Sequence, residues 1–219
     1  MAEKLSSHIR QPGSINREIR RLRLRDLPVD TVELAKYLIG KSLVREIPRG
    51  RLTGRIVETE AYLAGDAAAH SFRGLTPRNK SLFLERGHAY VYFCYGNHYM
   101  LNVSGGEKGT GTGVLIRAVE PIGGIDIMKR MRHTDRLRDL ARGPGRVASA
   151  FRITRDLDGL NLVNGAGSLW LGSAVRKVDA IGESIRIGIT KDAHRVLRFY
   201  ELGSPFVSGP KRLNTRIVI

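Results

Sequence analysis

The prediction of the fold depends mainly on residues 51–63, RLTGRIVETEAYL. Their alternating pattern and their β-branched and aromatic side chains are typical of a long β-strand. Because successive side chains of a strand point to opposite faces, the run has two expected faces. One carries Glu58, Glu60 and Tyr62, and the other carries Val57, Thr59 and Ala61.

Further strand-like runs lie on both sides of this stretch. They are residues 42–47, 89–93, 98–104, 111–121, 168–173, 184–189 and 197–202. Turn residues near Pro48-Arg49-Gly50 separate run 42–47 from the central run. Turn residues Tyr95-Gly96-Asn97 join run 89–93 to run 98–104. Short turns connect antiparallel neighbours. We therefore expect a curved, largely antiparallel sheet with a protruding β-hairpin.

Two regions have helical signals. Asp30 or Thr31 can cap a helix whose apolar side chains recur at helical spacing up to Gly40. Residues 122–153 are expected to be mostly helical, with a break at GPGR (143–146). That break is interpreted either as a phosphate-facing loop or as a plain turn between helices. With the strands, these helices predict a mixed α/β (α+β) fold, a single compact domain with helices flanking the sheet.

The chain has 219 residues and no sign of an internal boundary, so residues 24–219 are expected to form one domain. Residues 1–23 are polar and rich in arginine. They are interpreted either as a mobile basic arm that contacts phosphate or as a solvated, disordered start, and the sequence leaves both open.

Charge is the most unusual feature of the composition. Lys and Arg number 37 against 21 Asp and Glu, which gives a formal net charge of +16. Such a balance predicts a positive surface that attracts polyanions in a salt-dependent way. A basic protein with no role on nucleic acid is the alternative.

Cysteine and hydropathy exclude several classes of protein. Cys94 is the single cysteine, so no intramolecular disulfide and no cysteine cluster for zinc is expected. The zinc-dependent deaminases are excluded for the same reason. We expect no metal and no cofactor. No apolar run is long enough to span a membrane, and the first residues lack the apolar core of a secretion signal. The expectation is a soluble, cytoplasmic protein associated with the nucleoid.

Glu60 is the leading candidate for catalysis. It lies in the middle of a predicted strand among side chains that pack, and Tyr62 and His70 follow it closely. A carboxylate in such a place can activate water or balance a developing positive charge. Most glutamates on strands are surface residues, so a solvated side chain is the alternative. Glu58 shares its face, and the sequence does not rank the two.

Arg117 lies inside the apolar run VLIRAV (114–119). Because an unpaired guanidinium is costly to bury, we expect it to pair with a carboxylate, and Glu60 is the predicted partner. An arginine that points outward from a half-exposed strand is the alternative.

Tyr95 is a large aromatic residue at the predicted tip of the 89–104 hairpin, where it gains little from the core. On a basic protein, such a side chain suits insertion into the minor groove of DNA, in the space that an extruded nucleotide leaves. A tyrosine that folds back over the hairpin is the alternative.

These residues together resemble a known family. The resemblance rests on RIVETEAYL (55–63), His70, TPRN (76–79), YVYFCYG (90–96), Asn102, the strand with Arg117 and LRFYELGSP (197–205). In this order they are similar to the alkyladenine, or 3-methyladenine, DNA glycosylases, from about residue 24 to about residue 208. The resemblance implies a base-flipping DNA repair enzyme that removes 3-methyladenine, 7-methylguanine, hypoxanthine or ethenoadenine from double-stranded DNA.

The resemblance also implies roles for single residues. Glu60 matches the general base that activates water, and Arg117 with the backbone carbonyl near Ile187 matches the groups that hold that water. The residues that enclose the flipped base are matched by Tyr62, His70 and Tyr92. Asn102 matches the group that obstructs guanine. Tyr95 matches the residue that intercalates into DNA. No lysine lies in this set, so we expect water as the nucleophile and no strand-cleaving lyase activity. We also expect the protein to act as a monomer and away from membranes.

Two rival functions remain at this point. A non-catalytic protein that binds DNA or RNA would use the same basic surface and aromatic rings. An enzyme for a small anionic substrate is the other, although it would not require positive charge spread from the first residues to Arg155. A carboxylate inside the base pocket distinguishes the first rival, because a binder has no need of one.

Overall fold

Strand β2 (Gly50–Tyr62) runs through the middle of the structure and is buried along almost its whole length. The structure is a computed structural model, and it describes residues 19–94, 96, 98–165 and 167–215. Along one edge, β2 pairs with β5 (Thr112–Gly123). Along its other edge it pairs first with β1 (Ser42–Ile47) and then, at Glu58–Glu60, with β8 (Arg198–Glu201). The two carboxylates therefore lie where three strands meet.

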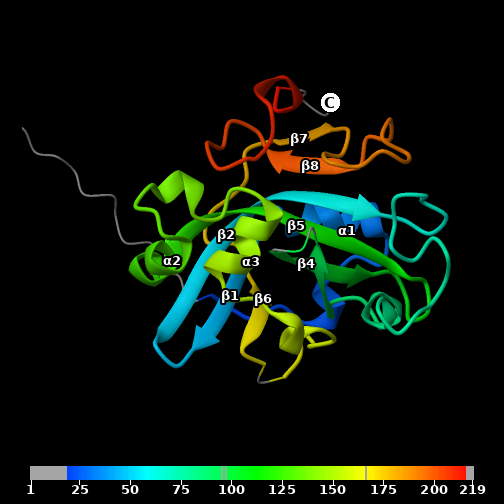
Figure 1. Cartoon of the computed structure of the whole chain (residues 1–219), viewed down its shortest axis with the longest axis horizontal. Coiled ribbons are helices and arrows are strands. Elements are labelled where there is room, and N and C mark those ends of the chain that lie inside the picture. The colour runs from blue at the N-terminus through cyan, green and yellow to red at the C-terminus, as the bar shows by residue number, and fades with distance from the viewer. Residues whose placement is uncertain (1–18, 95, 97, 166, 216–219) are drawn as a thin grey trace, which may run out of the picture.

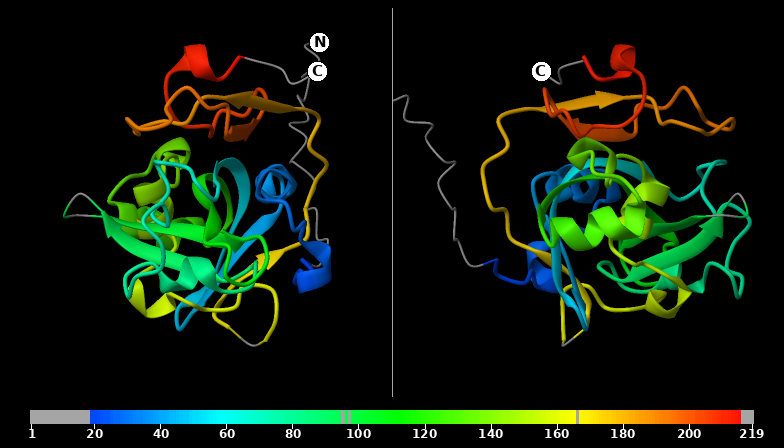
Figure 2. Two further views of the ribbon diagram at one scale, coloured as in Figure 1. Left: turned by 90° about the vertical axis from the view of Figure 1, so that its right-hand side faces the viewer. Right: turned by 60° about the vertical axis from the view of Figure 1, so that its left-hand side comes forward.

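The remaining strands extend this sheet. They are β3 (Ala89–Cys94), β4 (His98–Gly105), β6 (Leu169–Gly172) and β7 (Ile181–Ser184). The order is β3-β4-β5-β2-β1-β6, with β7 joined through β8, and every pairing among the described strands is antiparallel. The sheet curls strongly (Figure 1), and the β3–β4 hairpin projects from one side of it (Figure 2). The predicted α+β fold with a curved antiparallel sheet and a protruding hairpin is confirmed.

Helix α1 (Thr31–Leu38) begins as predicted. The Asp30 carboxylate accepts hydrogen bonds from the backbone N–H groups of Val32 and Glu33, which satisfies two donors that the first turn leaves free. The apolar face of α1 is buried against β2 and β5. Asp30, and not Thr31, is therefore the cap.

Residues 122–153 are less helical than predicted. Residues 122 and 123 continue β5, and only α2 (Ile125–Arg132) and α3 (Pro144–Ala150) are α-helices. Gly124 and His133 flank α2 with left-handed backbone angles, and Gly143 has a φ of 131° just before α3. Gly124 and Gly143 therefore mark where the two helices begin, and His133 ends α2, because a continuing helix requires negative φ. After α3, Arg152 has a φ of 50°. Short 3-10 turns complete the described helices, at Leu24–Asp26, Lys80–Phe83, Leu137–Asp139, Arg155–Leu157 and Lys211–Leu213.

A bulge interrupts β2 beside the two carboxylates. The pairing with β5 shifts between Ile56 and Glu58 and again between Glu58 and Thr59. Val57 consequently packs in a small cluster with Tyr200 and Val207, whereas Ala61 packs in the main core. The predicted alternation therefore does not hold at Val57, because a bulge places two residues opposite one and re-aims the side chains near it.

The predicted strand at 184–189 is displaced toward the N-terminus. Strand β7 ends at Ser184, and residues 185–189 form a loop beside the end of β2. The reason lies in the backbone of Ile187, whose N–H and carbonyl bond to side chains of the site and not to a neighbouring strand. Strands β7 and β8 and the described residues after them lie at the top of Figure 1, where β8 joins the sheet by pairing with β2.

The residues just before Leu24 contact the edge of the sheet. Leu22 is buried, and its backbone N–H donates to the carbonyl of Leu171, while Arg21 bridges to Gly172. Residues 19–23 of the predicted arm thus pack on the edge of the sheet at β6. Residues 1–18 lie outside the described residues, so the behaviour of the arm stays a prediction.

Candidate active site

A cavity of about 300 Å³ opens between the end of β2, the β3–β4–β5 sheet and two loops. The residues that line it are Tyr62, Ala68, Ala69, His70, Ser71, Leu82, Tyr90, Tyr92, Cys94, Met100, Asn102, Gly111, Gly113, Leu115, Arg117, Pro144, Ile187, Gly188 and Ile189. All the predicted pocket residues are among them. The cavity is mostly apolar with a few polar groups, as is typical of a binding site for a flat ring.

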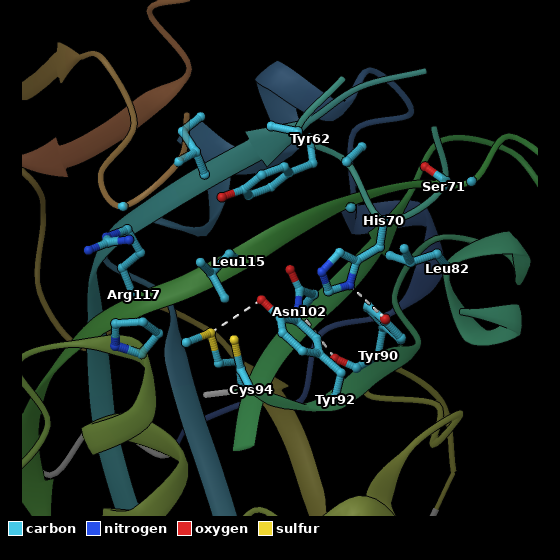
Figure 3. A pocket seen from close by; sticks show the side chains of 18 of the residues that line it. Tyr62, His70, Ser71, Leu82, Tyr90, Tyr92, Cys94, Asn102, Leu115 and Arg117 are labelled. Atoms are coloured by element: carbon cyan, nitrogen blue, oxygen red, sulfur yellow. Dashed lines mark hydrogen bonds between the residues drawn. The ribbon is translucent and has the colours of Figure 1, made fainter. Parts of the chain in front are cut away.

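Aromatic side chains form two walls of the cavity. Figure 3 shows the Tyr62 ring on one side of the space and the Tyr92 ring on the other, with His70 between them at one end. The His70 and Tyr92 rings meet edge to face with centroids 4.3 Å apart, and Tyr90 stacks behind Tyr92 at 5.3 Å. These packed rings hold one another in place, so the gap between Tyr62 and Tyr92 is pre-formed.

His70 is oriented by Tyr90. The His70 Nδ1 and the Tyr90 hydroxyl are 2.8 Å apart and share a hydrogen bond. Loss of water around the imidazole lowers the pKa of His70, and the nearby Arg78 lowers it further. Burial raises the pKa of Tyr90 to about 12. His70 is therefore neutral near pH 7, with its Nε2 able to donate or accept in the cavity.

Asn102 comes from β4 and lies at the back of the cavity (Figure 3). Its side chain is 6% exposed, and its Nδ2 contacts the Tyr90 carbonyl at 3.5 Å. Strand β5 lies directly beside it in the sheet, because Asn102 pairs with Leu115. A side chain held in this way has little room to move aside.

Glu60 lies beneath the cavity and is completely buried. Its Oε1 accepts from the Ile187 N–H at 2.7 Å and contacts Arg117 Nη1 at 3.2 Å, while its Oε2 accepts from the Tyr62 hydroxyl at 3.0 Å. Glu60 itself does not line the cavity, but these three residues do. The alternative of a solvated surface glutamate is wrong.

Burial sets the protonation behaviour of Glu60. Loss of water raises the pKa of this carboxyl, and Glu58 raises it further; Arg117, the Ile187 N–H and the Tyr62 hydroxyl offset only part of the increase. The result is a pKa above the ordinary glutamate value. A carboxylate with a raised pKa is a stronger base, as general bases in enzymes require.

Arg117 joins the two carboxylates. Its Nε donates to Glu58 Oε1 at 3.1 Å, and its Nη1 lies 3.2 Å from Glu60 Oε1 and 3.3 Å from the Ile187 carbonyl. The side chain is 8% exposed, so the alternative of an outward-pointing arginine is wrong. The predicted pair with Glu60 is present, and Glu58 is a second partner that the sequence did not assign to Arg117.

Glu58 has a different environment, which ranks the two carboxylates. It accepts from Arg198 Nε at 2.6 Å, from the Ser208 N–H at 2.6 Å and from the Ser208 hydroxyl at 2.9 Å, in addition to Arg117. Burial acts to raise its pKa, but the two arginines and Ser208 outweigh burial and hold the pKa of Glu58 below its usual value. Glu58 is therefore a structural anion whose oxygens are already occupied.

A buried ion pair supports the wall from behind. The Arg186 guanidinium makes a bidentate pair with Asp66, and both side chains are fully buried. The same guanidinium stacks on the Tyr62 ring, 4.6 Å from its centroid, and Nη1 donates to the Ala61 carbonyl at 3.0 Å. It thereby fixes both Tyr62 and the loop that carries Ile187.

Several residues of the site were not predicted. Tyr90, Leu82 and Met100 line the cavity, and Arg198 and Ser208 hold Glu58. Tyr90 had a usable signal, because it alternates with Tyr92 on the same strand. Arg198 and Ser208 come from more than 130 residues away in the chain and had none. Tyr95 lies outside the described residues, so its insertion into DNA stays a prediction.

Two further observations concern metal ligands and membrane spans. Among the described residues, no group of three or more His, Cys, Asp or Glu side chains could hold a metal ion. No helix in the described part of the chain has the length and apolar character needed to cross a membrane.

An aromatic slot backed by a buried carboxylate, on a strongly basic protein, is the arrangement expected of an enzyme that takes one nucleobase out of a duplex. Comparison with known proteins agrees. The family model described as Methylpurine-DNA glycosylase matches residues 25–205. The chain belongs to this family.

Individual relatives cover almost the same residues. A protein of Mesorhizobium japonicum named "Putative 3-methyladenine DNA glycosylase" is 65% identical over 86% of this chain and 90% of its own length. Proteins of the same name from Paraburkholderia phytofirmans and Methanoculleus marisnigri are 50% and 48% identical. These matches cover 86% and 82% of this chain, and 88% and 94% of the relatives.

Membership confirms the predicted resemblance. The protein is a DNA glycosylase, a DNA repair hydrolase that acts on N-glycosyl bonds, and DNA is its substrate. The rival interpretation as a non-catalytic binder is wrong, and so is that of an enzyme for a small anionic substrate.

Proposed function

We propose that the enzyme flips alkylated or deaminated purines out of duplex DNA and hydrolyses their N-glycosidic bond with water activated by Glu60. The proposal rests on one observation above all. Glu60 is buried directly beneath the cavity, and each side chain or backbone group that holds it also lines the cavity.

The carboxylate has one oxygen suited to water. Ile187 and Arg117 both contact Oε1, whereas only the Tyr62 hydroxyl donates to Oε2. Each carboxylate oxygen can accept two hydrogen bonds, so Oε2 can accept one from water. The Ile187 carbonyl accepts from Arg117 Nη1 at 3.3 Å and keeps a second lone pair, which can accept a hydrogen bond from the same water molecule.

The reaction follows the logic of an inverting glycosidase. Alkylation at N3 or N7 makes the purine cationic and therefore a good leaving group. As the bond to C1′ breaks, the sugar gains oxocarbenium character, and the anionic Glu60 stabilises this positive charge while it takes a proton from the attacking water. The products are the free base and an abasic site.

Selectivity comes from the walls of the cavity. The rings of Tyr62 and Tyr92 stack on a flat purine, and electron-poor alkylated rings stack most strongly between electron-rich faces. Asn102 is fixed at the back of the cavity, where it obstructs the 2-amino group of normal guanine. Damaged or mispaired bases also cost less to unstack, which adds a second level of discrimination.

The proposed enzyme is monofunctional. Among the described residues that line the cavity there is no lysine, so they offer no amine to attack C1′ and form a Schiff base. Strand cleavage by a lyase step is therefore not expected. We further propose that the protein acts as a monomer in the bacterial cytoplasm, on the nucleoid.

Duplexes with one lesion test the function. The enzyme is incubated with DNA carrying 7-methylguanine, hypoxanthine or 1,N6-ethenoadenine, and abasic sites are then cleaved with alkali. Cleavage that depends on both lesion and alkali supports the proposal. Cleavage without alkali would contradict a monofunctional mechanism, and no cleavage of any lesion would contradict the function itself.

A further inference from the structure

A second hollow, which we call the arginine hollow, lies at the far end of α3 from the cavity. It has a volume of about 540 Å³ and is lined by Pro48, Arg49, Ile127, Arg130, Met131 and Arg152. None of these residues lines the active-site cavity. The two sites lie at opposite ends of one short helix, because Pro144 at the start of α3 lines the cavity and Arg152 follows its last turn.

The cations of the arginine hollow are unsatisfied. Within the part of the chain that the structure describes, the guanidinium groups of Arg49, Arg130 and Arg152 make no hydrogen bond or ion pair, and all three residues are exposed. Neighbouring arginines are held by acceptors of the protein: Arg132 by Leu140, Arg138 by Pro205, Arg142 by Val207 and Arg146 by Asp139. The three guanidinium groups of the hollow therefore differ from these four neighbours, which are held by acceptors of the protein.

The three guanidinium groups of the arginine hollow lie around one small part of the surface. Burial lowers the pKa of Arg45, Asp156 acts to raise it, and Arg152 has a smaller lowering effect. The backbone of Arg152 has a φ of 50°, in the left-handed region that side chains other than glycine rarely adopt. Like charges gathered in one hollow repel one another unless an anion lies between them.

We propose that the arginine hollow binds backbone phosphates of the substrate duplex about three base pairs from the extruded nucleotide. The seven residues of α3 span about 10 Å at 1.5 Å per residue, and each strand of B-DNA advances about 3.4 Å per base pair. Guanidinium groups bind phosphate oxygens with paired hydrogen bonds, and the apolar side chains of Ile127 and Met131 suit the face of a deoxyribose.

This inference rests on the proposed function, because the extruded nucleotide fixes where the duplex lies. Figure 1 shows α3 between α2 and β4, so a duplex at the β3–β4 hairpin reaches the hollow by passing over α3. Phosphates at the hollow orient the duplex without reading its sequence. The hollow therefore contributes to affinity and register and has no part in bond cleavage.

The test combines protein variants with neutral phosphates. The double variant Arg130→Gln/Arg152→Asn removes two cations of the hollow, and asparagine tolerates the positive φ at residue 152. The matched control, Arg25→Gln/Lys177→Gln, removes two exposed cations from segments on the side opposite the hairpin (left view of Figure 2). Each protein is titrated with lesion duplexes in which one phosphate at a time is replaced by methylphosphonate, and Arg49→Gln serves as a milder second variant.

We expect the parent to lose about tenfold in affinity when a phosphate about three base pairs from the lesion is neutral, the loss of one charge-assisted hydrogen bond. The hollow variant should not respond at that position, and its slope of log affinity against log salt should be shallower by about 2. The control should respond like the parent. Equal responses of hollow variant and parent at every position would overturn the inference, while excision by the parent would still uphold the proposed function.

Discussion

Glu58 and Glu60 are two residues apart on β2 and share one guanidinium, that of Arg117, at 3.1 Å and 3.2 Å. Their remaining contacts differ. Glu58 is held by Arg198 and Ser208 as well, and its pKa is lowered, whereas Glu60 faces groups that line the cavity, and its pKa is raised. One carboxylate is therefore stabilised as an anion, and the other is kept as a base.

This difference predicts opposite effects of two matched substitutions on stability. Glu58→Gln removes the charge that compensates two buried arginines, so the free energy of unfolding should fall by about 3 kcal/mol. Glu60→Gln removes a carboxylate that burial disfavours, so the same quantity should stay equal or rise by about 1 kcal/mol. Urea unfolding at pH 7 measures both. An equal loss in the two variants would contradict the assignment of roles.

The pH dependence of these effects has a fixed sign. The lowered pKa of Glu58 means that its contribution to stability is present above the unfolded-state value of about 4.5 and is lost as the pH falls through its folded-state pKa. The raised pKa of Glu60 means that its ionisation costs stability as the pH rises through a value above 4.5. The increase in the free energy of unfolding of Glu60→Gln should therefore appear only at pH values above the raised pKa of Glu60.

Glu60 should also govern the acidic limb of the rate profile. With 7-methylguanine, which leaves without added protonation, kcat/KM should fall as the pH drops through the raised pKa of Glu60, because only the carboxylate accepts the proton of water. The midpoint should lie above 4.5. A rate that stays constant down to pH 4.5 would show that another group, or none, acts as the base.

Substitution of Asn102 should change the specificity of the enzyme without loss of activity. Asn102→Ser shortens the side chain that is fixed between Tyr90 and β5, which opens space at the back of the cavity. The ratio of hypoxanthine to guanine excision should fall about tenfold or more, as for other small steric contacts in a pocket. The two rates are measured in duplexes of the same sequence. An unchanged ratio would place the discrimination elsewhere.

Substitution of Tyr95 should cause a defect in excision that depends on whether the lesion is base-paired. Tyr95→Ser should weaken excision of a paired lesion, because the space left by the extruded nucleotide is no longer filled. For a lesion in a mispair, which costs less to unstack, the defect should be smaller. Single-turnover rates across a range of enzyme concentrations give both values. Equal rates of parent and variant on paired DNA would remove the wedge role.

Local signals made much of the fold predictable. The Asp30 cap, the apolar spacing of residues 31–38 and the long strand β2 depend on neighbours in sequence, and the structure contains each of them. The motif around Glu60 was recognisable because its residues are contiguous. Arg117 could be paired with a carboxylate because a charge inside an apolar strand needs a partner.

The rest depended on contacts between distant segments. In the sequence, Arg198 looks like an alternating strand residue, yet it lies fully buried against Glu58 because β8 joins β2 at that point. Ile187 was placed on a strand, but its backbone bonds to Glu60 and Arg117. The bulge at Glu58 has no local sequence signal. Each of these features arises only when the sheet closes.

The most direct test of the account is the single-turnover rate of 7-methylguanine release by Glu60→Gln, measured with saturating enzyme. Glutamine fits the same space but cannot take the proton of the attacking water, so the rate should fall at least about a hundredfold while affinity for the lesion duplex stays within a few-fold. Release within a few-fold of the parent rate would contradict the claim that this carboxylate drives hydrolysis.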